Sequence, residues 1–127
     1  MMGRTGAPVT VALRGQAPLA PAVQVVLYRI AQEALNNVAR HAEATQVEVD
    51  YDAEPGRARL SIRDNGCGFD VEAVTRDHFG LQNMRERAAA IGAEVEIVSQ
   101  PGAGTQVTVE WREEHGDGRE TGSSPDR

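Results

Sequence analysis

The segment from Pro21 to about His41 constrains the fold most, because its apolar residues recur at steps of three and four. That spacing is the period of a helix with one buried face. Pro21 suits a first turn, where its missing N–H would have no partner inside the helix. The stripe needs a second layer to cover it, and it consists of Val23, Leu27, Ile30, Ala34 and Val38.

Five other segments alternate apolar and polar residues, the pattern of strands with one buried face. A second amphipathic segment, from Leu81 to Ile91, predicts a helix that Gly92 ends. Two helices on one side of an open sheet is the economical arrangement, so we expect an α/β (α+β) fold in the form of a two-layer sandwich. The strand segments lie near residues 9–13, 47–52, 57–63, 94–97 and 106–111.

The second and third strands are predicted to form a hairpin that turns through residues 53–56. In the expected register Asp52 faces Arg57. Asp50 then faces Arg59, so an acidic strand lies beside a basic one on the outer face. A solvated charge ladder explains this pattern better than a binding surface does.

Composition limits the class of protein. The 127 residues suffice for one domain, which we place at residues 9–112, with a leader at 1–8 and a disordered tail at 113–127. A net charge of −6 gives no reason to expect nucleic acid or an anionic membrane as a partner. No apolar run reaches the roughly 20 residues of a membrane span, and no signal peptide is visible, so we expect a cytoplasmic chain.

Individual residue counts exclude two kinds of site. All 13 cations are Arg, so the chain lacks the lysine of a Walker-type phosphate loop. The single cysteine, Cys67, can make neither a disulfide within the chain nor a zinc site of several thiolates.

Glu33 and Asn37 are four residues apart, so their side chains are neighbours at the edge of the apolar stripe. An Asn carbonyl is a neutral oxygen ligand for Mg²⁺ that does not repel phosphates. A carboxylate beside it can accept a proton from a nucleophile or orient it. Taken alone, the pair is equally consistent with a solvated helix surface.

Asp64 follows a strand and precedes Gly66 and Gly68, a loop in which a ligand can come close to the backbone. A carboxylate can accept a hydrogen bond from the amino group of adenine but would face the keto oxygen of guanine. Asp64 would therefore select adenine, although Asp-Asn-Gly is also a common turn sequence.

The order of the first six elements also fits a ferredoxin-like module, which includes RNA readers. Such a reader would carry stacking aromatics and a basic surface. The expected outer face carries charged and polar residues, and the chain has only five aromatics. This alternative stays open at this point.

Four motifs occur in a fixed order and together resemble the catalytic ATP-binding domain of bacterial sensor histidine kinases, in the GHKL superfamily. The similarity is greatest to the subfamily paired with response regulators that carry LuxR/NarL-type DNA-binding domains, and it covers about Val9 to Trp111. The motifs are Glu33-x-x-x-Asn37, Asp64-x-Gly66-x-Gly68-Phe69, Gly80-Leu81-x-x-Met84-Arg85-Glu86-Arg87 and Gly102-x-Gly104-Thr105.

The resemblance implies a Bergerat-type ATP-binding fold, with a mixed five-stranded sheet covered on one face by helices, and ATP and Mg²⁺ as cofactors. It implies that Asn37 ligates Mg²⁺, that Glu33 is the general base or orienting group, and that Asp64 binds the adenine amino group. Gly66 and Gly68 are implied to shape the adenine pocket, and Thr105 to support the adenine end. Gly80 and Leu81 are implied to anchor a lid over residues 69–80. Arg40 and His41 are implied site residues that follow the magnesium ligand in the sequence.

The resemblance also implies that the phosphate acceptor is missing. The accepting His of the family lies on an upstream dimerisation domain, and none of His41, His78 and His115 has its acidic context. The implied partners are ATP/ADP, that dimerisation domain in a homodimeric parent, and a response regulator. The isolated chain is expected to bind ATP with little or no turnover. Two alternatives remain, an anti-sigma-factor-type serine kinase of the same superfamily and a non-catalytic nucleotide-binding module.

Overall fold

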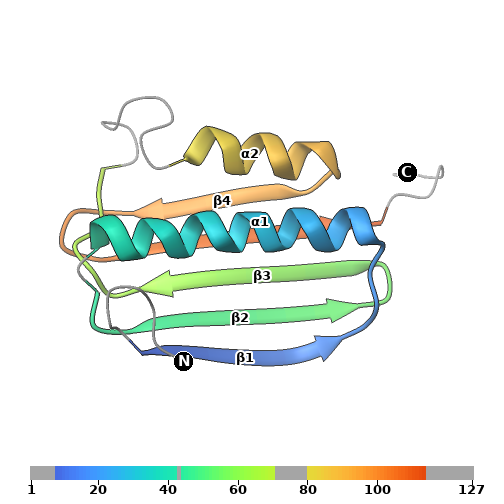
Figure 1. Cartoon of the computed structure of the whole chain (residues 1–127), viewed down its shortest axis with the longest axis horizontal. Helices are drawn as coiled ribbons and strands as arrows, with labels where there is room; N and C mark the ends of the chain where they lie inside the picture. The colour runs from blue at the N-terminus through green and yellow to red at the C-terminus, as the bar shows by residue number, and fades with distance from the viewer. Residues whose placement is uncertain (1–7, 43, 71–79, 114–127) are drawn as a thin grey trace.

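The computed structural model describes residues 8–42, 44–70 and 80–113 (Figure 1). A strand comes first, then the long helix, a hairpin, the second helix and two final strands, as the sequence predicts. The elements are β1 (Val9–Gln16), α1 (Pro21–Asn37), the π-helical turn η1 (Val38–Ala42), β2 (Val47–Glu54), β3 (Arg57–Asp64), α2 (Leu81–Ala90), β4 (Glu94–Ser99) and β5 (Thr105–Arg112).

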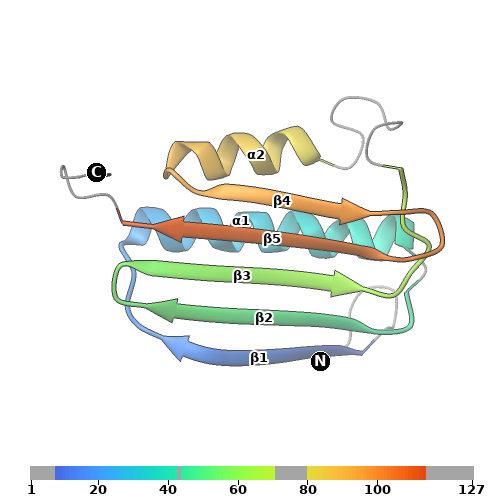
Figure 2. The same cartoon turned by 180° about the vertical axis from the view of Figure 1, so that it is seen from behind.

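The five strands form one mixed sheet in the order β1-β2-β3-β5-β4. β1 runs parallel to β2, and the other neighbours are antiparallel. Both helices pack on the same face, and no helix covers the other face in the described part of the chain (Figures 1 and 2). The predicted two-layer sandwich is therefore confirmed.

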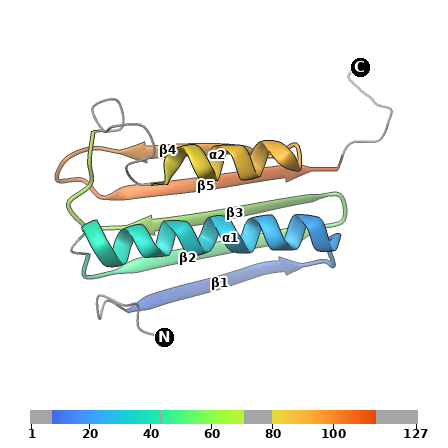
Figure 3. The same ribbon diagram turned by 45° about the horizontal axis from the view of Figure 1, so that its top comes forward.

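The helices lie over one face of the sheet (Figure 3), and the buried apolar side chains of both layers form the core. Every predicted stripe residue of the long helical segment is buried, and Ile30 is fully buried against the sheet. Met84 gives α2 a comparable anchor, while Val47 and Val109 fill the sheet side. Because apolar burial is the main favourable term in folding, this layer holds the helices in place.

Strand β1 departs from its predicted half-buried pattern. Only Val9 is buried, whereas Val11 is 51% exposed and Leu13 is 53% exposed. The cause is position, because β1 is an edge strand with β2 as its only neighbour in the sheet.

The predicted register of the hairpin is wrong by two residues. Asp52 lies opposite Arg59, and Asp50 lies opposite Ser61. A two-residue turn at Pro55 and Gly56 closes the hairpin, so β2 runs two residues further than expected, to Glu54, while β3 begins at Arg57 as expected.

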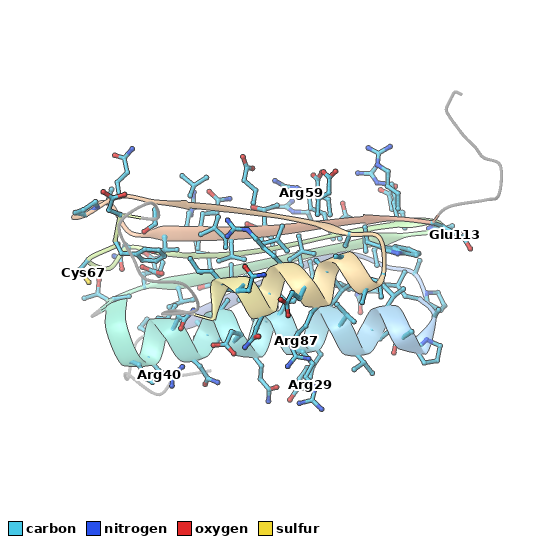
Figure 4. The ribbon with its side chains drawn as sticks, turned by 90° about the horizontal axis from the view of Figure 1, so that it is seen from above. Arg29, Arg40, Arg59, Cys67, Arg87 and Glu113 are labelled. Carbon is cyan, nitrogen blue, oxygen red and sulfur yellow. The ribbon has the colours of Figure 1, made fainter. Side chains whose placement is uncertain are left out.

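The outer face is nevertheless a charge ladder, as predicted. Arg63 pairs with Glu48 on β2, and Arg59 Nε lies 3.1 Å from a carboxylate oxygen of Glu110 on β5. Figure 4 shows Arg59 on this face, away from the helices. Exposed pairs of this kind contribute little to stability individually.

The helix was predicted to end near His41, but its last residues do not have α-helical geometry. The α-helix ends at Asn37, and the chain continues as the π-helical turn η1. A π turn holds more residues per turn than an α-helix, and such turns often occur at functional sites. The predicted lid, leader and tail fall largely or wholly outside the described residues.

Ile30→Ala is expected to lower the free energy of unfolding by about 2–5 kcal/mol, because it leaves a cavity in a fully buried site. The control is Val25→Ala on the same helix, where the parent side chain is 54% exposed and the change should stay within about 0.5 kcal/mol. Urea denaturation measures both. Similar losses for the two variants would contradict the described orientation of α1.

Candidate functional site

A mainly apolar cavity of about 50 Å³ lies between the helices and one end of the sheet. Its apolar wall includes Ala34, Ile62 and Met84, and its polar groups are Asn37, Asp64 and Thr105. Ligand pockets usually hold roughly 300–1,000 Å³, so a drug-sized ligand would require this cavity to widen. The elements that surround it are α1, α2, β3, β4 and β5, which the sheet order brings to one place.

Asp64 is the buried charged group of this cavity, with 7% of its surface exposed. Gly66 N–H donates to its Oδ1 at 2.8 Å, and the backbone N–H of Thr105 also donates to its carboxylate. Burial raises the pKa of Asp64, and the two backbone hydrogen bonds act in the opposite direction. The carboxylate is thus fixed in direction while it still has lone pairs for a ligand.

The loop that follows Asp64 packs directly on the loop before β5. Gly68 has a φ of +64°, and a Cβ there would collide with the backbone oxygen of Gln100 and lie 2.9 Å from that of Gly104. Gly102 N–H donates to the backbone oxygen of Cys67 at 2.6 Å. The two predicted glycine motifs therefore meet, and only glycine fits where they touch.

The predicted helix pair lies on the other side of the cavity. Asn37 lines it, and its Oδ1 atom is buried. Glu33 lies one turn earlier, against the start of α2, where a Cβ on Gly80 would be 2.6 Å from Glu33 Cδ. Arg40 reaches back along the helix to place Nη2 3.8 Å from Glu33 Oε2.

The structure thus brings most of the predicted site residues to one end of the molecule. Leu81, Gly68 and Thr105 line the cavity together with Asp64 and Asn37. The other predicted residues whose side chains the structure describes do not line it: Gly80 lies against Glu33 and Gly66 holds Asp64, whereas Arg40 lies at the outer surface of the helix layer (Figure 4). The side chain of His41 lies outside the described residues.

Two residues of this region were missed by the sequence analysis. Asn65 holds the segment before β2 through hydrogen bonds with Thr45 N, Thr45 Oγ1 and Gln46 N. Ser99 is 9% exposed at the end of β4 and touches both glycine loops. Its signal was a polar residue at a position where the alternation of β4 demands an apolar one, whereas Asn65 gives no comparable signal.

The family of the chain follows from comparison with known proteins. Residues 22–115 match the model of the family described as "Histidine kinase-, DNA gyrase B-, and HSP90-like ATPase". The match covers well over half of the chain, so the chain belongs to this family of ATP-binding domains. The predicted GHKL membership is confirmed, and the ferredoxin-like alternative is excluded.

Within the family, the chain is a domain of the sensor-histidine-kinase type. It is 45% identical over 83 residues to the sensor histidine kinase LiaS of Bacillus subtilis, which covers 65% of this chain and 23% of LiaS. It is 46% identical over 83 residues to the sensor protein VraS of Staphylococcus aureus strain COL, which covers 65% of this chain and 24% of VraS. The chain therefore spans less than a quarter of these relatives.

Solved structures agree on the fold. The histidine kinase domain of the blue-light activated kinase of Erythrobacter litoralis superposes with a TM-score of 0.62 at 20% identity, over 82% of this chain and 51% of that one. Full-length ShkA in complex with AMPPNP gives a TM-score of 0.66 at 26% identity, over 85% of this chain and 26% of that one. None of the helices in the described ranges is long and apolar enough to cross a bilayer.

Asp64→Asn is expected to change how stability depends on pH. Because burial raises the pKa of Asp64, the folded protein keeps this proton to a higher pH than the unfolded chain does. As pH rises from the usual value of 3.8 through the raised pKa, the parent should lose stability relative to the variant. Urea denaturation from acid to neutral pH measures the difference.

The control for that experiment is Asp52→Asn, which removes the same charge. Asp52 lies on β2 near the turn of the hairpin, whereas the cavity lies at the opposite end of these strands, beside Asp64. A parent that gains stability relative to Asp64→Asn as pH rises would show that the Asp64 charge is not disfavoured in the folded state.

Three glycine variants separate backbone strain from collision. Gly102→Ala meets nothing within 4 Å, so it should cost only the positive φ, about 1–3 kcal/mol. Gly80→Ala should cost a similar amount, because the Glu33 side chain that it meets can turn away. Gly68→Ala meets two backbone oxygens and should cost clearly more. Thermal denaturation ranks the three, and an equal loss for Gly68 and Gly102 would refute the loop contact.

Proposed function

We propose that the chain binds ATP with Mg²⁺ at this cavity and supplies the γ-phosphoryl group to a His on another domain of a longer sensor histidine kinase. One observation carries the proposal: a buried carboxylate, Asp64, held by two backbone N–H groups at the polar end of an apolar cavity. An apolar slot with one directed acceptor fits a flat base that carries an amino group.

The adenine end would be formed by both glycine loops. Asp64 would accept from the amino group of the base, and the apolar wall would cover its faces. Gly66 and Gly68 would let the base approach the backbone, and Thr105 would support it from β5. The close packing of the two loops supports this assignment, because a side chain at Gly68 would force them apart.

The phosphate end would lie toward the start of α2. Asn37 fits Mg²⁺ as a neutral oxygen ligand, and its position on the cavity wall supports that role. The metal, when bound, would neutralise charge on the phosphates. Gly80 and Leu81 would lie near the phosphates. Arg40 and His41 come after the magnesium ligand Asn37 in the chain, in η1, and would belong to the same end of the site.

Glu33 would act on the attacking nucleophile. In the transfer step a ring nitrogen of the acceptor His forms a bond to the γ-phosphorus as the bond to the bridging oxygen of ADP breaks. Glu33 would orient the imidazole or accept its proton, and ADP would leave with the bridging oxygen. Glu33 lies against the start of α2, which is the end of the site where the γ-phosphate would lie, and this position supports the role of Glu33.

The acceptor would be supplied by the rest of the parent protein. We propose a His-bearing dimerisation domain in a homodimeric kinase, followed by transfer to an Asp of a LuxR/NarL-type response regulator, with this domain in the cytoplasm. The chain alone would bind ATP with little or no turnover.

Calorimetric titration tests nucleotide binding. The parent chain with Mg²⁺ is expected to bind ATP more tightly than GTP, and Asp64→Asn should weaken ATP binding at least tenfold, because a directed charged acceptor is lost. Asp52→Asn, outside the cavity, is the matched control. Failure of the folded parent to bind either nucleotide would reject the proposed function.

A transfer assay tests catalysis. The chain is mixed with the separately produced dimerisation domain of its parent kinase and with ATP labelled on the γ-phosphate. Acid-labile label on His is expected, and Glu33→Gln should lower its rate by about 10²–10⁴-fold with little change in ATP affinity. Label on Ser of a partner protein would favour the serine kinase, and ATP binding without any transfer would favour the regulatory module.

A further inference from the structure

The hydroxyl of Ser99 makes three hydrogen bonds at the point where the two glycine loops meet. Phe69 N–H donates to Ser99 Oγ at 2.9 Å, and Ser99 Oγ lies 3.2 Å from the backbone oxygen of Gly104. Ser99 Oγ also lies 2.7 Å from Thr105 Oγ1. Thr105 lines the cavity, whereas Ser99 stands behind it and is not among the residues that line it.

Counting protons fixes the direction of the third bond. A serine hydroxyl has one proton to donate and two lone pairs. The backbone N–H of Phe69 can only donate, and the backbone oxygen of Gly104 can only accept. The single proton of Ser99 therefore goes to Gly104, and Thr105 must donate its own proton to Ser99.

The hydroxyl of Thr105 therefore offers a ligand in the cavity only lone pairs, because its proton is donated to Ser99. Its charged neighbour Asp64 is also an acceptor, and the two residues face each other in the β3–β5 ladder. Two acceptors side by side favour a ligand edge that carries N–H groups. A keto oxygen at the same position would face two acceptors with no donor, which is costly in a buried site.

We propose that Ser99 is a specificity-determining residue: by taking the proton of Thr105, it makes this end of the cavity select a base with an amino group over a base with a keto oxygen. The proposal rests on the proposed nucleotide-binding function and extends it to a residue that touches no ligand. Ser99 acts through Thr105, so it is a positioning residue.

A purely structural role makes a different prediction. If Ser99 only ties the loops together, its loss would loosen the site for every base equally. If it sets the direction of the Thr105 hydroxyl, its loss would free that proton to turn toward a keto oxygen, and the discrimination between bases would fall.

The experiment compares ATP with inosine triphosphate, which carries a keto oxygen where ATP has its amino group. Dissociation constants with Mg²⁺ are measured by calorimetry for the parent, Ser99→Ala and Ser99→Thr. The preference for ATP is expected to fall about tenfold in Ser99→Ala, the equivalent of one altered hydrogen bond. Ser99→Thr keeps the hydroxyl and should keep the preference.

A second pair of variants tests the route through Thr105. Thr105→Val removes the hydroxyl oxygen that accepts at this position and should also reduce the preference for ATP over inosine triphosphate. Adding Ser99→Ala to Thr105→Val should narrow it no further, because the residue through which Ser99 acts is already gone. Ser61→Ala is the matched control, since it removes a buried hydroxyl that bonds Gln106 on the outer face.

The outcomes separate this proposal from the proposed function. Equal weakening of both nucleotides in Ser99→Ala, or an unchanged preference, would overturn the role of Ser99 and leave ATP binding intact. A folded parent that binds neither nucleotide would overturn both.

Discussion

A carboxylate that is buried at the end of a strand is the constraint on which the cavity end of this domain depends. Burial of Asp64 is unfavourable for its charge, and the cost is reduced only because Gly66 and Thr105 direct backbone N–H groups at it. Gly66 lies in the loop after β3, whereas Thr105 is the first residue of β5 and far away in the sequence. The pairing of β3 with β5 is therefore needed to stabilise the charge of Asp64 as well as to form the core.

Helix α1 serves the core and the site with the same periodicity. Ile30 and Ala34 point into the sheet, and the helical period then places Glu33 and Asn37 at the edge that faces α2. Packing of the stripe thus sets the rotation of the helix, and the rotation sets where these two side chains lie. A residue that changed the packing would move the site without touching it.

Local patterns in the sequence were sufficient for the elements, whereas the site residues such as Leu81 and Thr105 came from the resemblance of the ordered motifs to a known family. Helical and strand periodicity predicted the two layers, and Gly66 and Gly68 predicted a loop whose backbone a ligand can approach; that this loop packs on the loop before β5 is seen only in the structure. The hairpin register was misread, because opposite charges face each other in both registers and the length of the turn decides between them; the predicted turn has four residues, whereas the turn in the structure has two. Ser99 was missed because its partners come from other loops, and the exposure of Leu13 depends on β1 being an edge strand.

The arrangement of turns gives the domain two chemically different ends. Everything that forms the cavity lies where β3 ends and β5 begins, whereas the turn at Pro55 and Gly56 lies at the opposite end of the eight-residue strands. Eight residues in a strand span about 25 Å. A label, an inserted peptide or an added domain at that turn would therefore report on the molecule, or attach it to a surface, without entering the region where the nucleotide is proposed to bind.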